Sequence, residues 1–455
     1  MKKSLLFLIL FISIAAAQDL RINVPYTRFT LPNGLDVILH VDRSIPRVAV
    51  NTWYHVGSGN EKPGRTGFAH LFEHLMFMGS KDVPTGKFDE WLEAAGADNN
   101  GSTTPDRTNY YEDLPSNALE LALFLDSDRM GYLVDAMSPQ AVDAQRDVVK
   151  NERRQSYENR PYGMSSIVIE ENLYPPSHPY HWPTIGSMAD LSAASYEDVV
   201  QFFRTYYAPN NASLSIAGDI DVEKTKQLVE KWFDEIPRGK PVPLIDSPPA
   251  YLSEEKRVAF EDRVQLPRLY MAWLSPAQFT PGDAELDILA YVLAGGKNSR
   301  LYKRLVYDLQ IAQDVTAFQA SQKQISSFEI IATARAGHTL TEIEKIVQEE
   351  IDKVKQENPS KREVERAVNQ YEASFVNRLE RIDGIADQLN GYLTATGDPD
   401  YFNEDLARYR AVDPDDVSSF ARTILRDDGR VVLSVVPKGK KDLAAPGTFI
   451  STEGK

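Results

Sequence analysis

Residues 67–78 read GFAHLFEHLMFM, and the predicted fold of the first half is built around this stretch. Three polar side chains, His70, Glu73 and His74, interrupt an apolar run that is too long for a typical strand. This composition indicates a helix that is buried on most sides. The glycine-rich segment 57–67 precedes it and is expected to be a loop.

The three polar residues form an H-x-x-E-H motif with helical spacing. His70 and His74 are four residues apart and lie on one face of a helix, so both imidazoles can reach one cation. At ~100° per residue, Glu73 falls on the same face. The motif reverses the commoner H-E-x-x-H order and presents the same chemical groups. It therefore predicts a catalytic metal site.

A third metal ligand has to come from another part of the chain. Catalytic zinc usually takes three protein ligands and leaves a fourth position for water, and Glu73 is better suited to act as the general base. The chain has no cysteine, so any metal must be held by His, Asp or Glu. The segment 142–159 is expected to be helical and offers Glu152 and Glu158, between which the local sequence does not decide.

Two pairs of similar segments indicate an internal duplication. Residues 45–47 (IPR) and 266–268 (LPR) each open a predicted strand, about 220 residues apart. The segments 195–205 (SYEDVVQFFRT) and 413–423 (DPDDVSSFART) match at nearly the same separation. Repeated offsets of this kind predict two successive copies of one unit.

The duplication is asymmetric at the motif. The helix at 68–78 aligns with residues 286–295, where Asp287, Ala290 and Tyr291 stand opposite His70, Glu73 and His74 in that order. Metal-binding chemistry is therefore expected in the first copy alone.

Strand and linker patterns complete the fold prediction. Residues 27–40 read as a hairpin around Asn33-Gly34, residues 47–54 as a strand, and the proline-rich stretch 237–249 as a linker. We predict an α+β protein with two homologous α/β-sandwich domains. The expected divisions are a signal peptide at 1–17, a zinc-bearing domain at 24–237, a linker at 238–251, a homologous domain without zinc ligands at 252–438 and a tail at 439–455.

The N-terminus resembles a secretory signal. Lys2 and Lys3 precede the apolar run 5–14, and small residues at 15–17 precede Gln18. A membrane anchor is the alternative, but the run falls short of the ~20 residues that span a bilayer. We expect a periplasmic or secreted protein with no stable membrane insertion. The absence of cysteine fits an exported protein without disulfides.

The net charge of −16 bears on the class of partner. Such a charge leaves no basic surface for phosphates, which argues against nucleic acid. It would attract basic peptides more readily than acidic ones.

With these motifs the sequence resembles the pitrilysin family of inverted-motif zinc peptidases, which includes insulin-degrading enzyme and the mitochondrial processing peptidase. In that family a glutamate about 77 residues beyond the second histidine completes the zinc site; Glu152 lies at that position, within the matching stretch 148–154. The resemblance implies one Zn²⁺ per chain on His70, His74 and Glu152, with Glu73 as base. Gln145 stands where relatives carry another glutamate.

The resemblance also implies a peptide-binding strand. In the family an Asn-Ala-x-Thr pattern marks an exposed strand that holds extended peptide through its backbone, a mode known as strand addition. Asn100, Gly101, Ser102 and Thr103 match this pattern, with glycine in place of alanine. Without the resemblance, residues 98–101 would be interpreted as a plain turn.

A departure from the family concerns its second half. Active relatives carry an arginine and a tyrosine seven residues apart, and Val306 and Gln313 occupy those positions here. Arg300 and Tyr307 are also seven apart but out of register. The resemblance then implies a catalytic subunit that pairs with a homologous non-zinc subunit, which supplies the pair in a clamshell assembly. A homodimer is the alternative.

Two other functions compete with a zinc endopeptidase that cleaves peptides or unfolded segments. Residues 59–66 nearly match a phosphate-binding P-loop, but Arg65 replaces the required lysine and Pro63 removes one amide. A catalytically silent assembly subunit of the same fold is the second alternative, although the motif is complete in this chain.

Overall fold

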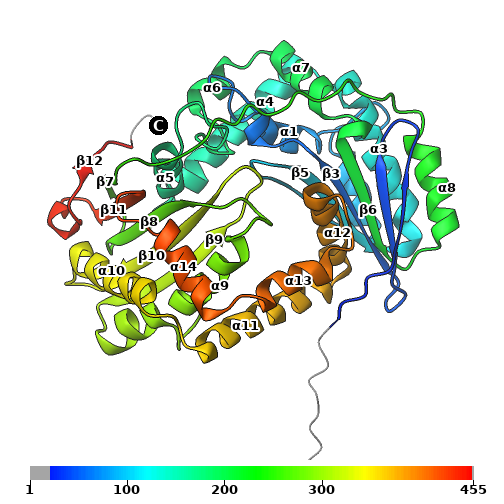
Figure 1. The fold of residues 1–455 in the computed structure, drawn as a ribbon. Helices are drawn as coiled ribbons and strands as arrows, with labels where there is room; N and C mark the ends of the chain where they lie inside the picture. The colour runs from blue at the N-terminus through cyan, green and yellow to red at the C-terminus, as the bar shows by residue number, and fades with distance from the viewer. Residues whose placement is uncertain (1–20, 453–455) are drawn as a thin grey trace, which may run out of the picture.

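The structure is a computed structural model that describes residues 21–452, and the predicted signal peptide lies outside the described residues. Two six-stranded sheets lie at opposite sides of the view in Figure 1, with helices between and around them. Among the helices of residues 21–452, none combines the length and the apolar character that crossing a bilayer requires.

The first sheet has the strand order β1-β2-β6-β3-β5-β4. Its strands are β1 (Tyr26–Thr30), β2 (Asp36–Val41), β3 (Arg47–Tyr54), β4 (Asp98–Thr103), β5 (Thr108–Pro115) and β6 (Ala212–Gly218). The predicted hairpin and the strand at 47–54 are confirmed, and Gly34 takes a φ of 97° in the hairpin turn. Only β2 and β6 run parallel among these strands, and β4 lies at the edge.

Eight α-helices accompany the first sheet in the described part of the chain. They are α1 (Phe68–Leu75), α2 (Lys87–Ala94), α3 (Leu119–Ala136), α4 (Pro139–Arg153), α5 (Ser165–Leu173), α6 (Met188–Ala193), α7 (Tyr196–Tyr206) and α8 (Val222–Phe233). The apolar faces of α1, α2, α3, α7 and α8 share one hydrophobic core with the sheet. The central strand β6 is buried at every residue, because both faces of the sheet are covered.

The second sheet repeats the arrangement of the first. Its strands are β7 (Lys256–Asp262), β8 (Arg268–Ser275), β9 (Ala312–Ala320), β10 (Ser326–Ala334), β11 (Arg430–Pro437) and β12 (Thr448–Phe449). Its helices are α9 (Asp283–Ala294), α10 (Leu340–Gln356), α11 (Lys361–Leu379), α12 (Ile382–Thr396), α13 (Phe402–Arg410) and α14 (Pro414–Ile424). The order β7-β11-β8-β10-β9 corresponds to β2-β6-β3-β5-β4, which confirms the predicted duplication.

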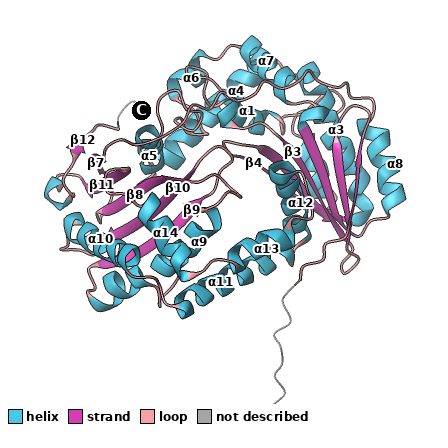
Figure 2. Cartoon of the chain, in the orientation of Figure 1, coloured by secondary structure: helices cyan, strands magenta, loops and turns pink. Residues whose placement is uncertain are grey.

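The two halves exchange helices across the molecule. Helix α5 of the first half packs on β8 and β11, and α12 of the second half packs on β3 and β6 (Figure 2). The backbone of Ile22 also pairs with the side chain of Asn403 on α13, at 2.9 and 2.8 Å. The stretch 237–250 has no helix or strand, as expected of a linker, and the domain limits assigned from the sequence remain a prediction.

Candidate metal centre

The start of helix α1 is capped by a buried carboxylate. Gly67 has a φ of 89°, and the amides of Gly67 and Ala69 donate to the two carboxylate oxygens of Glu61 at 2.9 and 2.8 Å. The first amides of a helix have no partner within it, so this carboxylate satisfies them. Burial raises the pKa of Glu61 to about 8, against the lowering effect of the backbone hydrogen bonds. Glu61 thus occupies the helix amides that a phosphate-binding loop would present to its ligand, which argues against the P-loop alternative.

Helix α1 is shorter than the sequence predicts. It ends at Leu75, and Phe77 and Met78 donate to carbonyls three residues back, in a tightened turn. Gly79 follows with a φ of 122°, a conformation that favours glycine and ends the helical path. The apolar pattern continues past Leu75 because Met76 is buried in the core and Phe77 packs against it, not because the helix continues.

The predicted ligands meet at one point. The Nε2 atoms of His70 and His74 lie 3.1 Å from each other, and each lies 3.1 Å from Oε2 of Glu152. Three ligands about 2.0–2.1 Å from a tetrahedral Zn²⁺ lie about 3.3 Å apart, so the observed spacing fits this ion. Within residues 21–452, this is the one group of three such side chains whose ligand atoms lie within 4.8 Å of one another.

Helix α4 delivers Glu152 and holds Glu158 away from the histidines. Hydrogen bonds with His70 and then His74 hold the pKa of Glu152 well below its usual range. Glu158 lies in a π-helical turn after α4 and pairs with the buried Arg153 at 2.7 Å. Of the two glutamates that the local sequence left open, Glu152 is therefore the one that approaches the histidines.

Glu73 lies on helix α1, and its side chain contacts strand β4. Its Oε2 accepts a hydrogen bond of 2.6 Å from Thr103 and lies 3.8 Å from Nδ1 of His70. Its side chain is 17% exposed, so it is reachable from solvent. Thr103 therefore holds this carboxylate beside the side chain of His70.

Strand β4 contains all four residues of the Asn-Gly-Ser-Thr pattern, so the plain-turn alternative is wrong. It is an edge strand, and its backbone passes close to the motif helix. A Cβ on Gly101 would lie 3.1 Å from Cγ of Glu73 and 3.3 Å from the Phe77 ring. A side chain at this position would therefore crowd Glu73 and Phe77.

The other sequence positions singled out lie apart from the three ligands. Nε2 of Gln145 lies 2.6 Å from the sulfur of Met78. Arg300 pairs with Glu363 at 2.8 Å, while Tyr307 is 72% exposed, so these two residues do not form a joint site. Val306 packs against the second core, and Gln313 lies exposed on β9.

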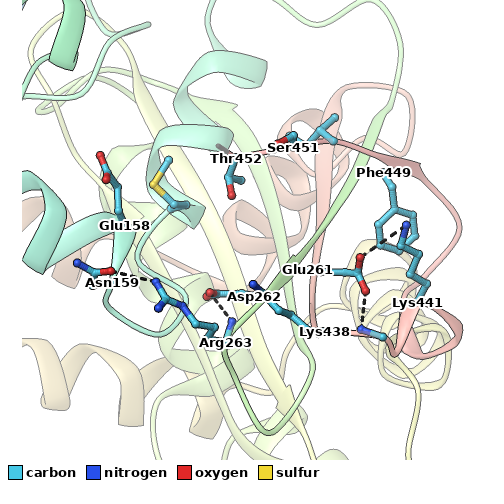
Figure 3. A pocket seen from close by; sticks show the side chains of 13 residues that line it. Glu158, Asn159, Glu261, Asp262, Arg263, Lys438, Lys441, Phe449, Ser451 and Thr452 are labelled. Carbon is cyan, nitrogen blue, oxygen red and sulfur yellow. Dashed lines mark hydrogen bonds and ion pairs between the residues drawn. The ribbon is translucent and has the colours of Figure 1, made fainter. Parts of the chain in front are cut away.

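A pocket of about 760 Å³ lies elsewhere, between the end of the α4 segment and the end of β7 (Figure 3). Arg263 donates to Asn159 at 2.9 Å across it, and Glu261 pairs with Lys441 at 3.6 Å. Glu158 lines this pocket and Glu152 does not. These two side-chain pairs join the first half to the loop after β7, and β7 to the C-terminal segment, so the pocket lies at a junction between halves.

Sequence reasoning missed two residues that shape the site. The first is Glu61, which a search for acidic residues just before the motif helix could have found. The second is Arg107 on the loop before β5, which donates to the carbonyl and hydroxyl of Ser102 at 2.9 and 2.7 Å. Arg107 also lies over the Trp53 ring, 5.2 Å from its centroid. No local pattern marks such a contact.

Comparisons with known proteins agree with this geometry. Residues 36–174 match the family model described as insulinase (peptidase family M16), and residues 193–371 match the model described as peptidase M16 inactive domain. The zinc protease PqqE of Helicobacter pylori is 28% identical, over 85% of this chain and 87% of that protein. A probable mitochondrial-processing peptidase subunit beta of Arabidopsis thaliana is 24% identical, over 93% of this chain and 81% of that protein.

The fold agrees as well. The crystal structure of a protease from Helicobacter pylori superposes with a TM-score of 0.86 at 26% identity, covering 91% of this chain and 100% of that one. The two matched regions belong to one family and lie on either side of residues 175–192. The chain therefore belongs to the M16 (insulinase, or pitrilysin) family of peptidases.

Proposed function

We propose that the chain is a zinc-dependent endopeptidase that hydrolyses peptides or unfolded segments. The observation that carries the proposal is the convergence of His70, His74 and Glu152 at mutual distances of 3.1 Å, with Glu73 beside them. Two imidazoles and one carboxylate are a ligand set of catalytic zinc, which keeps a further position for water. We propose one Zn²⁺ per chain.

A bound zinc would supply Lewis acidity and lower the pKa of a bound water towards ~7. Glu73 would accept the proton of the attacking water and deliver it to the leaving amine. Thr103, which donates to Glu73 at 2.6 Å, would keep the carboxylate turned towards the scissile bond. In this proposal Thr103 orients the carboxylate of Glu73, and the carboxylate oxygens of Glu73 accept and release the proton.

We propose that β4 holds the substrate by strand addition. Asn100, Gly101, Ser102 and Thr103 lie on the edge of the first sheet, where one side of the backbone has no neighbouring strand. Main-chain hydrogen bonds of this kind accept many sequences, which suits a peptidase for extended segments. The hydrogen bond from Thr103 to Glu73 joins this strand to the general base.

We also propose a partner and a location. Val306 and Gln313 stand where active relatives carry arginine and tyrosine, so a homologous non-zinc subunit would supply that pair in a clamshell, or two copies of this chain would pair. The N-terminal pattern of lysines, apolar run and small residues favours export to the periplasm or beyond.

A silent assembly subunit is the second candidate. The match of residues 193–371 to a model described as an inactive domain supports it. That match includes the aligned positions, which carry Asp287, Ala290 and Tyr291. The ligand cluster lies in the other half and favours the enzyme.

The test is the zinc content and peptidase activity of the purified chain. We expect about one zinc per chain, cleavage of a quenched unstructured peptide, loss of cleavage after chelation, and recovery when Zn²⁺ is restored. Stoichiometric zinc without cleavage, alone and with a homologous partner chain, would favour the silent subunit. A chain that retains no zinc would contradict the proposed centre.

A further inference from the structure

The turn between β4 and β5 is held by the second half of the chain. Figure 1 shows the β9–β10 hairpin reaching from the second sheet towards β4 and β5. At the contact, the amide of Lys323 donates to Oδ2 of Asp106 at 3.0 Å. Asp106 lies in the β4–β5 turn, so this bond joins residues 217 positions apart.

A second bond closes the contact into a ring. The hydroxyl of Tyr180 donates to Oδ1 of Asp106 at 2.5 Å and accepts from the amide of Gln324 at 3.0 Å. Tyr180 is buried, and burial first and the neighbouring Asp106 second raise its pKa, so the phenol keeps its proton to donate. Both oxygens of one carboxylate are thus used, one towards each half.

The same turn is connected through hydrogen bonds to strand β4 and to Glu73. Thr104 and Arg107 close it through a backbone bond of 2.9 Å, and Gly59 donates to the carbonyl of Pro105 at 2.8 Å. Arg107 then holds the backbone of Ser102, and the adjacent Thr103 donates to Glu73. A displacement of the turn would therefore be transmitted along β4 to the general base.

We propose that Asp106 is a positioning residue through which the half without metal ligands sets the place of strand β4, and with it Thr103 and Glu73. The inference rests on the proposed function for its kinetic consequence, and its structural consequence can be measured without it. Asp106 itself reaches Tyr180, Lys323 and the turn, and acts on the reaction through the strand that it holds.

The first variants are Asp106→Ala and Tyr180→Phe. Each breaks the ring and leaves His70, His74 and Glu152 untouched, so zinc content should equal that of the wild type. We expect a higher KM, since the strand that binds peptide is less ordered, and a lower kcat, since Glu73 is less well placed. Together the loss in kcat/KM for Asp106→Ala should approach ~10²-fold, the scale of a misplaced catalytic group. Asp106→Asn should recover only part of it, because the amide oxygen can still accept from Lys323 while the Tyr180 hydroxyl loses its acceptor.

The matched control is Tyr162→Phe. Tyr162 also joins the halves, through a hydroxyl that donates to the carbonyl of Leu266 at 2.8 Å, but it does not contact the β4–β5 turn. Its loss should leave both kinetic constants near wild type. Equal losses in Tyr162→Phe and Tyr180→Phe would overturn the proposal, since the effect would then be a general weakening between halves.

Hydrogen–deuterium exchange supplies the readout that does not depend on activity. Amides of residues 98–103 should exchange faster in Asp106→Ala and Tyr180→Phe than in the wild type and in Tyr162→Phe. If the wild-type chain cleaves no peptide, this arm still decides the inference. Unchanged exchange and kinetics in a folded Asp106→Ala or Tyr180→Phe variant would overturn it.

Discussion

The two halves of the chain share a strand order but use the same helix position in opposite ways. In the first half, α1 is faced by α4, which brings Glu152 to within 3.1 Å of His70 and His74. In the second half, α9 packs on α11, α13 and α14, and the hydroxyl of Tyr409 on α13 donates to Asp287 at 2.7 Å. Arg408 of the same helix pairs with Asp283 of α9 at 2.7 Å.

The difference shows that a duplicated helix keeps metal chemistry only if its neighbour presents ligands. The carboxylates of α9 are engaged by the protein's own donors, which hold them in place without an ion. The histidines of α1 face a carboxylate and a solvent-reachable side, with His70 14% and His74 25% exposed at the side chain. The polar groups of α9 thus serve packing, whereas the histidines of α1 stay partly open to solvent.

The largest expected effect concerns the arginine–tyrosine pair, in whose place the second half has Val306 and Gln313. Removing one preorganised donor to a developing oxyanion typically costs ~10²–10³ in rate. The purified chain should therefore bind zinc and cleave peptides weakly, and addition of a homologous chain with the arginine–tyrosine pair should raise the rate by that factor. Val306→Arg combined with Gln313→Tyr should recover part of it if two copies pair.

This prediction is wrong if the isolated, monodisperse chain cleaves a quenched peptide as fast as the mixture with the homologous chain does. Sedimentation under assay conditions would show whether the chain is alone. A fast monomer would mean that donors within this chain, and not a partner, stabilise the transition state.

Next in size is the loss of the general base. Glu73→Gln keeps the shape of the side chain and the hydrogen bond from Thr103 but can no longer accept a proton. We expect stoichiometric zinc with peptidase activity lower by at least ~10²-fold. Metal analysis and initial rates on the same preparation check this. Loss of zinc in this variant would make Glu73 a ligand.

The third prediction separates the two glutamates near the end of α4. A neutral amide is a poorer zinc ligand than a carboxylate, so Glu152→Gln should lose metal on dialysis against a mild chelator. Mutation of a residue that only hydrogen-bonds to a metal ligand costs about 10–100-fold in metal affinity. Loss of a ligand itself should cost more. Glu158→Gln is the matched control and should retain zinc, since Glu158 pairs with Arg153. The reverse result would reassign the third ligand.

Local patterns and distant contacts differ in how far the sequence predicts them. The strand Arg47–Tyr54 and the face shared by His70, Glu73 and His74 follow from periodicity, so they were predicted correctly. Glu152 lies 78 residues beyond His74, and only the family resemblance separated it from Glu158. Amphipathic patterns show that a helix buries one face, but not which sheet it meets, so the crossing of α5 and α12 was not foreseen.

The same limit explains what was missed near the site. The ring at Asp106 depends on two successive backbone amides of a loop more than 200 residues away, and backbone amides leave no mark in a sequence. The end of α1 was misplaced because Phe77 and Met78 continue the apolar pattern, whereas the φ of 122° at Gly79 ends the helix. Side-chain pattern predicts burial more reliably than it predicts backbone direction.

The smallest expected effect tests the packing role of the second half at Asp287, the counterpart of His70. Burial raises the pKa of Asp287 to about 7, although the hydrogen bond from Tyr409 lowers it. A carboxyl whose pKa is higher in the folded state than in the unfolded state stabilises the fold below the unfolded value, and this contribution is lost as pH rises through the folded value. Between pH 5 and pH 8 the free energy of unfolding should therefore fall by on the order of 2 kcal/mol on account of this group.

Asp287→Asn cannot ionise and should remove that part of the pH dependence, so the variant gains stability over the wild type at pH 8 relative to pH 5. Denaturant unfolding at both pH values measures the difference, and the exposed Asp308→Asn should keep the wild-type dependence. Zinc content should not change, because α9 lies outside the metal centre. If Asp287→Asn falls with pH as steeply as the wild type, the carboxyl is ionised in the folded state at neutral pH. Asp287 would then carry a negative charge, as a carboxylate metal ligand does, in spite of its burial. The contrast between α1 and α9 would in that case rest on their neighbours α4 and α13 alone.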